Sequence, residues 1–158
     1  MLKPWMIIGG ITIAIAVLGS SPIPPTGVKW FRRLQRPSWL TFEKAIPVIW
    51  TVVFVCGAWS AYIVWQQDPG STRTWVLMGI YALLEVVTVA YSTVMLWVKK
   101  LTVGLVIGAT GFVIGLLLAI AVLPLSLAAA ALLLPYLIWS PIGTYTTWAM
   151  MQLNPAET

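Results

Sequence analysis

The sequence contains no histidine and a single cysteine, Cys56. The chain therefore lacks the commonest protein metal ligand and the usual axial ligand of haem iron. One cysteine also excludes an intrachain disulfide. Charged residues make up only 8% of the chain. No Ser-His-Asp set, paired-carboxylate site, Walker loop or zinc-ligand spacing is present, so the sequence speaks against an ordinary enzyme and predicts no metal site.

Hydrophobic residues are abundant instead, at 60% of the chain with a mean hydropathy of +0.95. They form five apolar stretches, at residues 5–21, 45–65, 75–98, 101–123 and 125–151. A helix needs about 20 apolar residues to cross a bilayer, where its backbone must be hydrogen-bonded internally. We predict an all-α integral membrane protein: one domain over residues 1–158, a bundle of five transmembrane helices with a long first loop. The first stretch also fits a signal peptide, because Lys3 precedes it and small residues follow it.

Lys and Arg are divided unequally between the two sides of this bundle. Two of them, Lys3 and Arg73, fall on one side, and the other side carries Lys29, Arg32, Arg33, Arg36, Lys44, Lys99 and Lys100. Cytoplasmic loops carry such an excess of positive charge. We expect the N-terminus outside, the C-terminus in the cytoplasm and the protein in a bacterial inner membrane. Because topology accounts for the net charge of +5, nucleic acid is not an expected partner.

The first loop, residues 22–44, is interrupted by several prolines and contains the basic, aromatic segment 28–35. A short helix here would place Val28, Phe31 and Leu34 on one face, with Trp30 as a further candidate for it, and arginines on the other. Such a helix can anchor the loop on anionic lipid. It can also act as a lid over the cytoplasmic end of the bundle, and both roles are compatible.

The fourth stretch has a face of small residues: Gly104, Gly108, Gly111, Gly115 and Ala119. Such faces allow helix backbones to approach closely in lipid. The partner is either a neighbouring helix or a second subunit, and the expected assembly is a homodimer.

Ten tryptophans are present. Those at helix ends fit the membrane interface, where indoles collect. Trp50, Trp59 and Trp139 lie too deep for that explanation. Trp139 is near the middle of the fifth stretch between Pro135 and Pro141, each of which removes a helical hydrogen bond. We therefore predict a kinked or widened helix with a cavity beside Trp139, and the alternative is simple core packing.

Three motifs in register are specific. Arg36-Pro37-Ser38-Trp39 is followed by Trp50, and Leu134-Pro135-Tyr136-Leu137-Ile138-Trp139 lies in the last stretch. Together they resemble the translocator protein family, also called tryptophan-rich sensory proteins or peripheral benzodiazepine receptors. The resemblance covers almost the whole chain.

The resemblance implies a five-helix bundle around an apolar pocket that opens under the first loop. It implies a membrane receptor for porphyrins, including protoporphyrin IX and haem, and for other flat hydrophobic ligands. Sensing, transport and light-dependent porphyrin breakdown are the roles it suggests, with porphyrin as ligand and no obligatory cofactor. The implied ligand-binding residues are Trp39, Trp50, Phe54, Thr88, Tyr91, Pro135, Trp139 and Ile142. The implied lid residues are Phe31, Arg32 and Arg36.

The chain departs from the family pattern in several places. Leu40-Thr41-Phe42 replaces the usual Pro-Pro pair after Trp39, and Thr88 replaces an asparagine. Neither Tyr136 nor Tyr145 is followed by Lys or Arg, so the sterol motif is absent there, and that motif is weak even where it occurs. Cholesterol is not an expected ligand.

Physical chemistry supports a porphyrin independently. Aromatic stacking adds about 0.5–1.5 kcal/mol per pair, and indole N–H groups can donate to a ligand carbonyl or carboxylate. Arginines of the first loop could pair with porphyrin propionates. Because histidine is lacking, binding through the macrocycle is favoured over iron ligation. If photochemistry occurs, the indoles of Trp50 and Trp139 are the expected participants.

Glu85 supports an alternative function. A lone carboxyl in a transmembrane helix is costly and is by default a functional residue. It could load and release a proton in a small proton-coupled exporter of aromatic compounds. The simpler interpretation is a neutral carboxyl that is hydrogen-bonded to Ser or Thr on a neighbouring helix.

Overall fold

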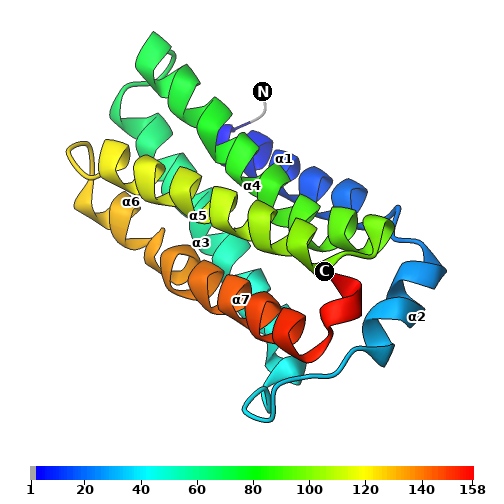
Figure 1. Cartoon of the computed structure of the whole chain (residues 1–158). Helices are drawn as coiled ribbons and strands as arrows, with labels where there is room; N and C mark the ends of the chain where they lie inside the picture. Colours follow the sequence, from blue (N-terminus) through cyan, green and yellow to red (C-terminus); the bar gives the residue numbers. More distant parts are fainter. Residues whose placement is uncertain (1–2) are drawn as a thin grey trace.

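The computed structural model describes residues 3–158, and helices account for most of them (Figure 1). The α-helices are α1 (Pro4–Ser20), α2 (Pro25–Arg33), α3 (Ile46–Gln67), α4 (Thr72–Val98), α5 (Leu101–Val122), α6 (Leu127–Ala131) and α7 (Leu134–Leu153). Two short 3-10 helices are η1 (Glu43–Ala45) and η2 (Pro155–Glu157).

Length and composition confirm the predicted membrane bundle. Four spans are long and apolar enough to cross a bilayer: Glu43–Gln67, Thr72–Val98, Leu101–Val122 and Leu127–Leu153. α1 and α2 together make a fifth candidate span, bent by 78° between them. At 1.5 Å per residue, α1 by itself reaches about 26 Å. The protein is therefore an all-α integral membrane bundle, and the predicted helix boundaries lie within a few residues of the observed ones.

The long helices form a closed ring. α1 packs against α4 and α3, α4 against α5, α5 against α7, and α7 against α3. The order around the ring is thus α1, α4, α5, α7, α3. Because α3 and α4 also touch each other, the space inside the ring is divided rather than continuous.

The glycine face of α5 is used within the chain. Gly104, Gly108, Gly111 and Gly115 are all buried. A Cβ atom at Gly111 would lie 2.6 Å from the Tyr136 hydroxyl oxygen, and one at Gly108 would lie 2.6 Å from Thr144 Oγ1. These positions allow α5 to approach α4 and α7 closely, which is the internal alternative of the two predicted for this face.

The predicted single helix over residues 125–151 is wrong in one respect. It is divided into α6 and α7, with a turn at Leu132 and Leu133. The cause is Pro135, which has no N–H to donate and sits in the first turn of α7. Pro141 lies inside α7 without ending it, so the break is upstream of Trp139 and not around it.

The break frees a carbonyl that would otherwise bond within the helix. The N–H of Leu133 donates to Ala130 O, leaving Ala129 O available. Ser60 Oγ of α3 donates to Ala129 O at 2.7 Å and lies 2.6 Å from the Tyr81 hydroxyl. Because the serine hydrogen is used on Ala129, Tyr81 is the donor in the second bond.

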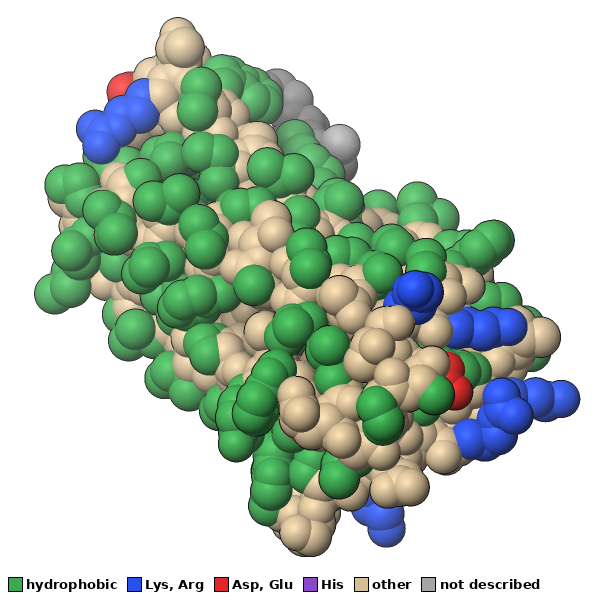
Figure 2. All heavy atoms as spheres, in the orientation of Figure 1, with side chains coloured by type: hydrophobic (Ala, Val, Ile, Leu, Met, Phe, Trp, Pro, Cys, Tyr) green, Lys and Arg blue, Asp and Glu red, His purple; other side chains and the backbone are tan. Residues whose placement is uncertain are grey.

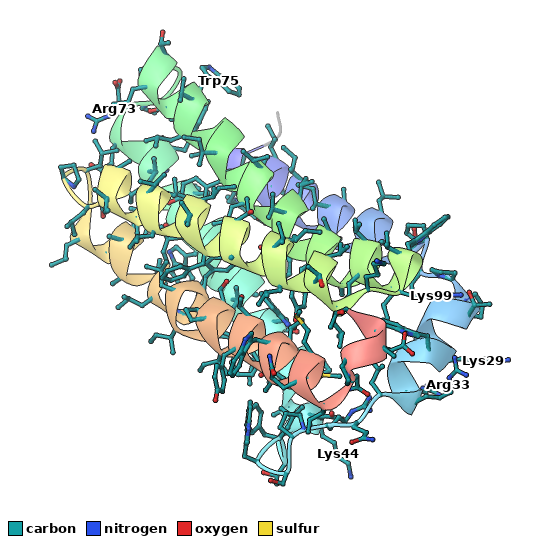
Figure 3. All side chains as sticks on the ribbon, viewed as in Figure 1. Lys29, Arg33, Lys44, Arg73, Trp75 and Lys99 are labelled. Carbon is teal, nitrogen blue, oxygen red and sulfur yellow. The ribbon has the colours of Figure 1, made fainter. Side chains whose placement is uncertain are left out.

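Basic side chains gather at one end of the molecule and apolar side chains cover its flanks (Figure 2). Lys29, Arg33, Lys44 and Lys99 lie at the end that carries α2, and Arg73 lies at the opposite end (Figure 3). The charge asymmetry predicted from the sequence is therefore present between the two ends. We call these the basic end and the Arg73 end.

Candidate functional site

The basic end contains a cavity of about 530 Å³, here called the main cavity. Its walls come from α3, α4 and α7, and its cover comes from α2 and the segment that follows α2. α1 contributes Ala16 and Ser20, whereas α5 contributes none of the lining residues. α5 instead supports α4 and α7 from behind through its glycine face.

Trp50 and Trp139 both line this cavity although they come from α3 and α7. Each is half-buried, and within residues 3–158 neither indole N–H has a hydrogen-bond partner. Phe54 lies 6.4 Å from Trp50 between ring centroids, and Phe42 meets Trp139 edge-on at 6.0 Å. The two deep indoles therefore face the interior of the bundle, with unused donors beside the cavity. Trp59, by contrast, is 60% exposed on the outer surface.

Thr88 and Tyr91 line the same cavity from α4. Thr88 donates its hydroxyl to Leu84 O at 2.7 Å within the helix. The Tyr91 hydroxyl pairs with the Thr147 hydroxyl across the cavity wall. The hydroxyl hydrogen of Thr88 is therefore already used within α4, and Thr88 can only accept a hydrogen bond from a ligand. The resemblance implies an asparagine at this position.

Three residues expected to bind ligand lie outside this lining. Trp39 is 41% exposed and stacks on Tyr145 at 5.8 Å, on the outer side of α7. Pro135 is in the first turn of α7, and Ile142 is exposed. Leu40 and Phe42, which follow Trp39, do line the cavity, in the segment where the sequence departs from the pattern that the resemblance implies.

The cover of the cavity, here called the lid, comprises α2 and residues 34–45. Gly27 and Trp30 are buried on the inner face of α2, followed by buried Leu34. Phe31 lines the cavity, and Lys29, Arg32 and Arg33 are exposed. The amphipathic helix predicted in the first loop is confirmed, and Trp30 is the most buried side chain on its apolar face.

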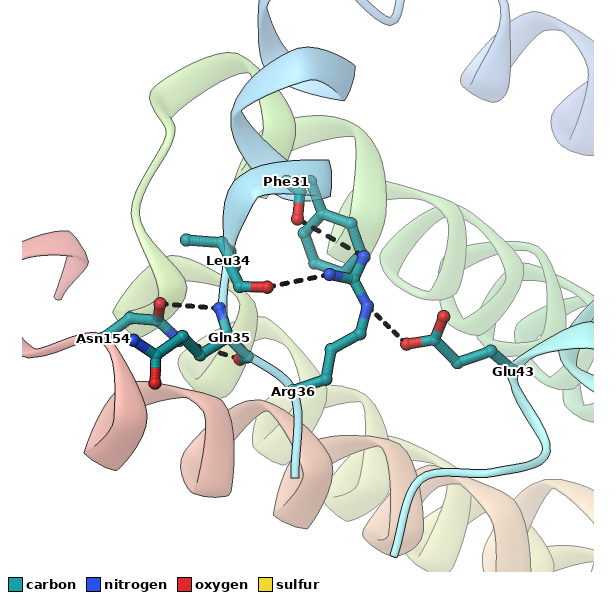
Figure 4. A network of polar contacts seen from close by, with 6 residues as sticks. All are labelled: Phe31, Leu34, Gln35, Arg36, Glu43 and Asn154. Carbon is teal, nitrogen blue, oxygen red and sulfur yellow. Dashed lines mark hydrogen bonds and ion pairs between the residues drawn. The ribbon is translucent and has the colours of Figure 1, made fainter. Parts of the chain in front are cut away.

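Arg36 holds the lid together (Figure 4). Its guanidinium donates to Glu43 Oε1, to Leu34 O at 2.9 Å and to Phe31 O at 3.4 Å, and lies 5.2 Å from the Phe31 ring centroid. Glu43 itself lines the cavity. Arg36 is therefore already paired, and of the lid arginines proposed to meet a ligand acid, Arg32 and Arg33 remain exposed.

The C-terminal segment also touches the lid. Gln35 and Asn154 form two hydrogen bonds, N–H to Oδ1 at 2.9 Å and Nδ2 to the Gln35 carbonyl at 3.0 Å (Figure 4). Trp30 Nε1 donates to Glu157 Oε2 at 2.7 Å. We call these contacts the C-terminal latch. The sequence alone gave no sign of it, because its partners are more than 110 positions apart.

Sequence reasoning also missed several lining residues. They are Leu40, Phe42, Glu43, Ile46, Ser92, Met95, Thr146 and Met150. Those on α4 and α7 follow Thr88 and Trp139 at helical spacings of three and four, so a 3.6-residue periodicity drawn from each would have found them. Those in the lid have no such pattern.

A second, separate space lies toward the Arg73 end, between α1, α3 and α4. It has a volume of about 330 Å³ and is here called the lateral pocket. Glu85 lines it and accepts a hydrogen bond from Thr12 Oγ1 of α1 at 2.7 Å. The predicted threonine partner on a neighbouring helix is thus present.

A small void of about 30 Å³ lies between the two larger spaces. It shares Phe54 and Thr88 with the main cavity and Tyr81 and Glu85 with the lateral pocket. Side chains of α3 and α4 therefore form the wall between them.

Trp50 and Trp139 come from helices far apart in the sequence and line one cavity beneath the lid, as the sequence motifs imply. The model of the TspO/MBR family matches residues 8–153. The chain belongs to the TspO/MBR family. This match includes α3, α4 and α7, which supply both indoles and the hydroxyl-bearing wall.

Individual TspO/MBR members are similar over most of their length. The tryptophan-rich protein TspO of Bacillus cereus is 30% identical over 136 residues, covering 85% of this chain and 87% of that protein. The protein of the same name from Chlorobaculum tepidum is 26% identical, covering 92% of each. The human translocator protein is 26% identical, covering 94% of this chain and 92% of that protein.

Proposed function

We propose that this TspO/MBR protein is a membrane receptor for porphyrins and other flat hydrophobic ligands, bound in the main cavity. The observation that carries the proposal is the placement of Trp50 and Trp139 around one space, each with an indole N–H that no residue of 3–158 accepts. A flat macrocycle would stack on these rings, and its carbonyl or carboxylate groups would accept their hydrogens.

Size and polarity fit this ligand class. At about 530 Å³ the main cavity falls within the range of drug-sized ligand sites, which is about 300–1,000 Å³. Its lining is mainly aliphatic and aromatic, with hydroxyls of Ser92, Thr146 and Thr147 on one side. An apolar ligand with a few polar substituents would be matched by such walls.

The acidic groups of a porphyrin would lie toward the basic end. Arg32 and Arg33 are exposed there and can swing toward a propionate, whereas Arg36 would first have to leave Glu43. We therefore assign propionate contacts to Arg32 and Arg33 and a positioning role in the lid to Arg36.

Fluorescence titration with protoporphyrin IX in nanodiscs tests the proposal. Trp50→Leu and Trp139→Leu should each weaken binding about tenfold or more, because each removes a stacking surface and a hydrogen-bond donor. Trp59→Leu is the matched control, since that indole faces outward. Unchanged affinity in both cavity variants would overturn the assignment of the site.

Light-dependent breakdown of the bound porphyrin is a further part of the proposal. Oxidisable indoles would lie against the excited macrocycle, with molecular oxygen as the oxidant. Illumination of the protein with protoporphyrin IX should bleach the ligand more slowly in a Trp50→Phe, Trp139→Phe double variant. Equal bleaching rates, corrected for occupancy, would exclude a role for these two residues.

The charge asymmetry supports an orientation with the basic end in the cytoplasm of a bacterial cell, so that the lid faces inward. Cysteines introduced at Lys99 and Arg73 in a Cys56→Ala background test this. A membrane-impermeant thiol reagent added to intact cells should label the Arg73 position and spare the Lys99 position. The reverse pattern would contradict the proposed orientation.

A further inference from the structure

The lateral pocket has a carboxyl, Glu85, that forms no ion pair among the described residues, whereas the carboxyl of the main cavity, Glu43, is paired with Arg36. The other polar groups of the lateral pocket are two hydroxyls and the indole N–H groups of Trp65 and Trp75, and its described lining includes no basic side chain. Trp65 and Trp75 meet edge-on at 5.0 Å near its outer end, and Ile7 and Ile11 beside it are exposed. Molecules dissolved in the acyl chains can therefore reach it from the side of the bundle.

The hydroxyl hydrogens of Thr12 and Tyr81 in the lateral pocket are already used in hydrogen bonds within the protein. Thr12 donates to Glu85 Oε1 at 2.7 Å. Tyr81 donates to Ser60, whose own hydrogen goes to Ala129 O. Neither hydroxyl can therefore donate to an occupant without giving up a bond. The indoles of Trp65 and Trp75 offer only N–H donors, so the Glu85 carboxyl is the group of this lining that would pair with a base.

Glu85 is only half satisfied by these contacts. Within residues 3–158 Thr12 is its hydrogen-bond partner, and it forms no ion pair. An ionised carboxylate would thus lie in a largely apolar space with one donor, and a neutral carboxyl would have Thr12 as its one hydrogen-bonding partner among the described residues. Either form is costly at mid-helix depth in a membrane.

We propose that the lateral pocket is a second ligand site, specific for a hydrophobic amine that enters from the bilayer and pairs with Glu85. The proton of the neutral carboxyl moves to the amine nitrogen, so a carboxylate–ammonium pair forms and no net charge is brought into the membrane. That pair is a charge-assisted hydrogen bond, and the apolar walls receive the rest of the molecule. A hydrophobic acid is disfavoured, because it offers Glu85 no base.

The site is distinct from the porphyrin site proposed above. Trp50 and Trp139 are absent from its lining, and the wall of α3 and α4 side chains separates the two spaces. Its failure and the failure of the porphyrin proposal can therefore be observed independently.

Equilibrium dialysis against nanodiscs tests the proposal, with empty nanodiscs correcting for partition into lipid. The probe is N,N-dimethyl-1-naphthylmethylamine, and the comparison compound is 1-isobutylnaphthalene, in which carbon replaces the nitrogen. The wild-type protein should bind the amine about tenfold or more tightly than the hydrocarbon. Equal binding would show an unselective apolar or lipid site and would overturn the proposal.

Two variants locate the effect. Glu85→Gln keeps an acceptor for Thr12 and should remove the preference for the amine while leaving hydrocarbon binding unchanged. Ala82→Leu should fill the pocket and weaken binding of both compounds. Retention of wild-type amine affinity in either variant would overturn the assignment.

A third variant excludes the main cavity as the amine site. Gly143 lines the main cavity, and a Cβ atom at this position would have no neighbouring atom within 4 Å, so the side chain of Gly143→Leu would occupy that space. It should leave amine affinity unchanged, and loss of amine binding here would place the amine in the main cavity instead. Protoporphyrin IX titration of Glu85→Gln and Ala82→Leu, expected to match the wild type, shows that these variants are folded.

Discussion

The main cavity and the lateral pocket are formed by the same bundle, and α1, α3 and α4 contribute to both. Each space is lined by two indoles. The main cavity adds several hydroxyls and a lid fixed by polar contacts. The described part of the lateral pocket has no such lid, and it contains one carboxyl without an ion pair. The proposed ligand classes therefore differ because of the few polar groups that each space has, since apolar walls and indoles are common to both.

The largest effect is expected from a substitution that displaces the lid, because only the main cavity is covered by it. A Cβ at Gly27 would overlap the Leu96 carbonyl oxygen, a backbone atom that cannot rotate away. Gly27→Val should therefore push α2 off α4 and lower the free energy of unfolding by about 1–3 kcal/mol. We expect protoporphyrin IX affinity to fall about tenfold, with amine binding unchanged.

Gly79→Val is the control for that substitution, since a Cβ at Gly79 has no atom within 4 Å. Thermal unfolding and both titrations measure the difference. Equal loss of both ligands in Gly27→Val would show that the two ends are coupled rather than independent.

The next largest effect is expected at Ser60, whose hydrogen bonds lie in the wall between the two spaces. Ser60→Ala leaves the Ala129 carbonyl and the Tyr81 hydroxyl without their partners in a buried position. We expect a loss of about 1–3 kcal/mol in the free energy of unfolding. Because Tyr81 lines the lateral pocket, amine binding should weaken more than porphyrin binding.

Denaturant unfolding in detergent measures this loss. Thr51→Ala is the control, because its hydroxyl bonds Pro47 O on an exposed turn of the same helix. An equal effect of both substitutions would contradict a special role for the Ser60 contacts.

The C-terminal latch should affect rates more than affinity. Trp30→Phe keeps the buried ring but removes the hydrogen bond to Glu157. Such a bond contributes about 0.5–1.5 kcal/mol, so protoporphyrin IX should dissociate about threefold faster. Stopped-flow displacement measures this rate. A Glu157→Gln variant should give a similar increase, and the double variant should add little to either.

The smallest effect is expected at the ion pair in the lid. Glu43→Gln removes the charge from the contact with Arg36, which is exposed enough for water and salt to screen it, and leaves the bonds from Arg36 to Leu34 O and Phe31 O in place. The expected change in porphyrin binding is below about 1 kcal/mol and should shrink further at high salt. A large, salt-independent loss would instead indicate direct contact between Glu43, which lines the cavity, and the ligand.

Helix positions and the two main indoles were predictable because their physical causes are local. Apolar length fixes a transmembrane helix, and the motifs around Trp50 and Trp139 placed both residues at a cavity. The glycine face of α5 predicted close packing but not its partner, since either a helix or a subunit can cover such a face.

The features that were not predicted have a different origin. Pro135 accounts for the break before α7, but the partners of the carbonyls that the break frees lie on other helices and have no local pattern. Ser60 supplies one such partner from α3. The C-terminal latch joins segments at opposite ends of the chain, which no local pattern reports. Polar contacts between residues far apart in the sequence were thus the features that could not be predicted.

The C-terminal latch has a practical consequence for work with this protein. Glu157 accepts a hydrogen bond from the indole of Trp30, which is buried on the inner face of the lid. A purification tag or fluorescent fusion joined directly after Thr158 would begin one residue from that contact and would strain it. Ligand-exchange rates measured on such a fusion would then report a loosened lid. Placing the tag in the exposed turn between α3 and α4 avoids the disturbance.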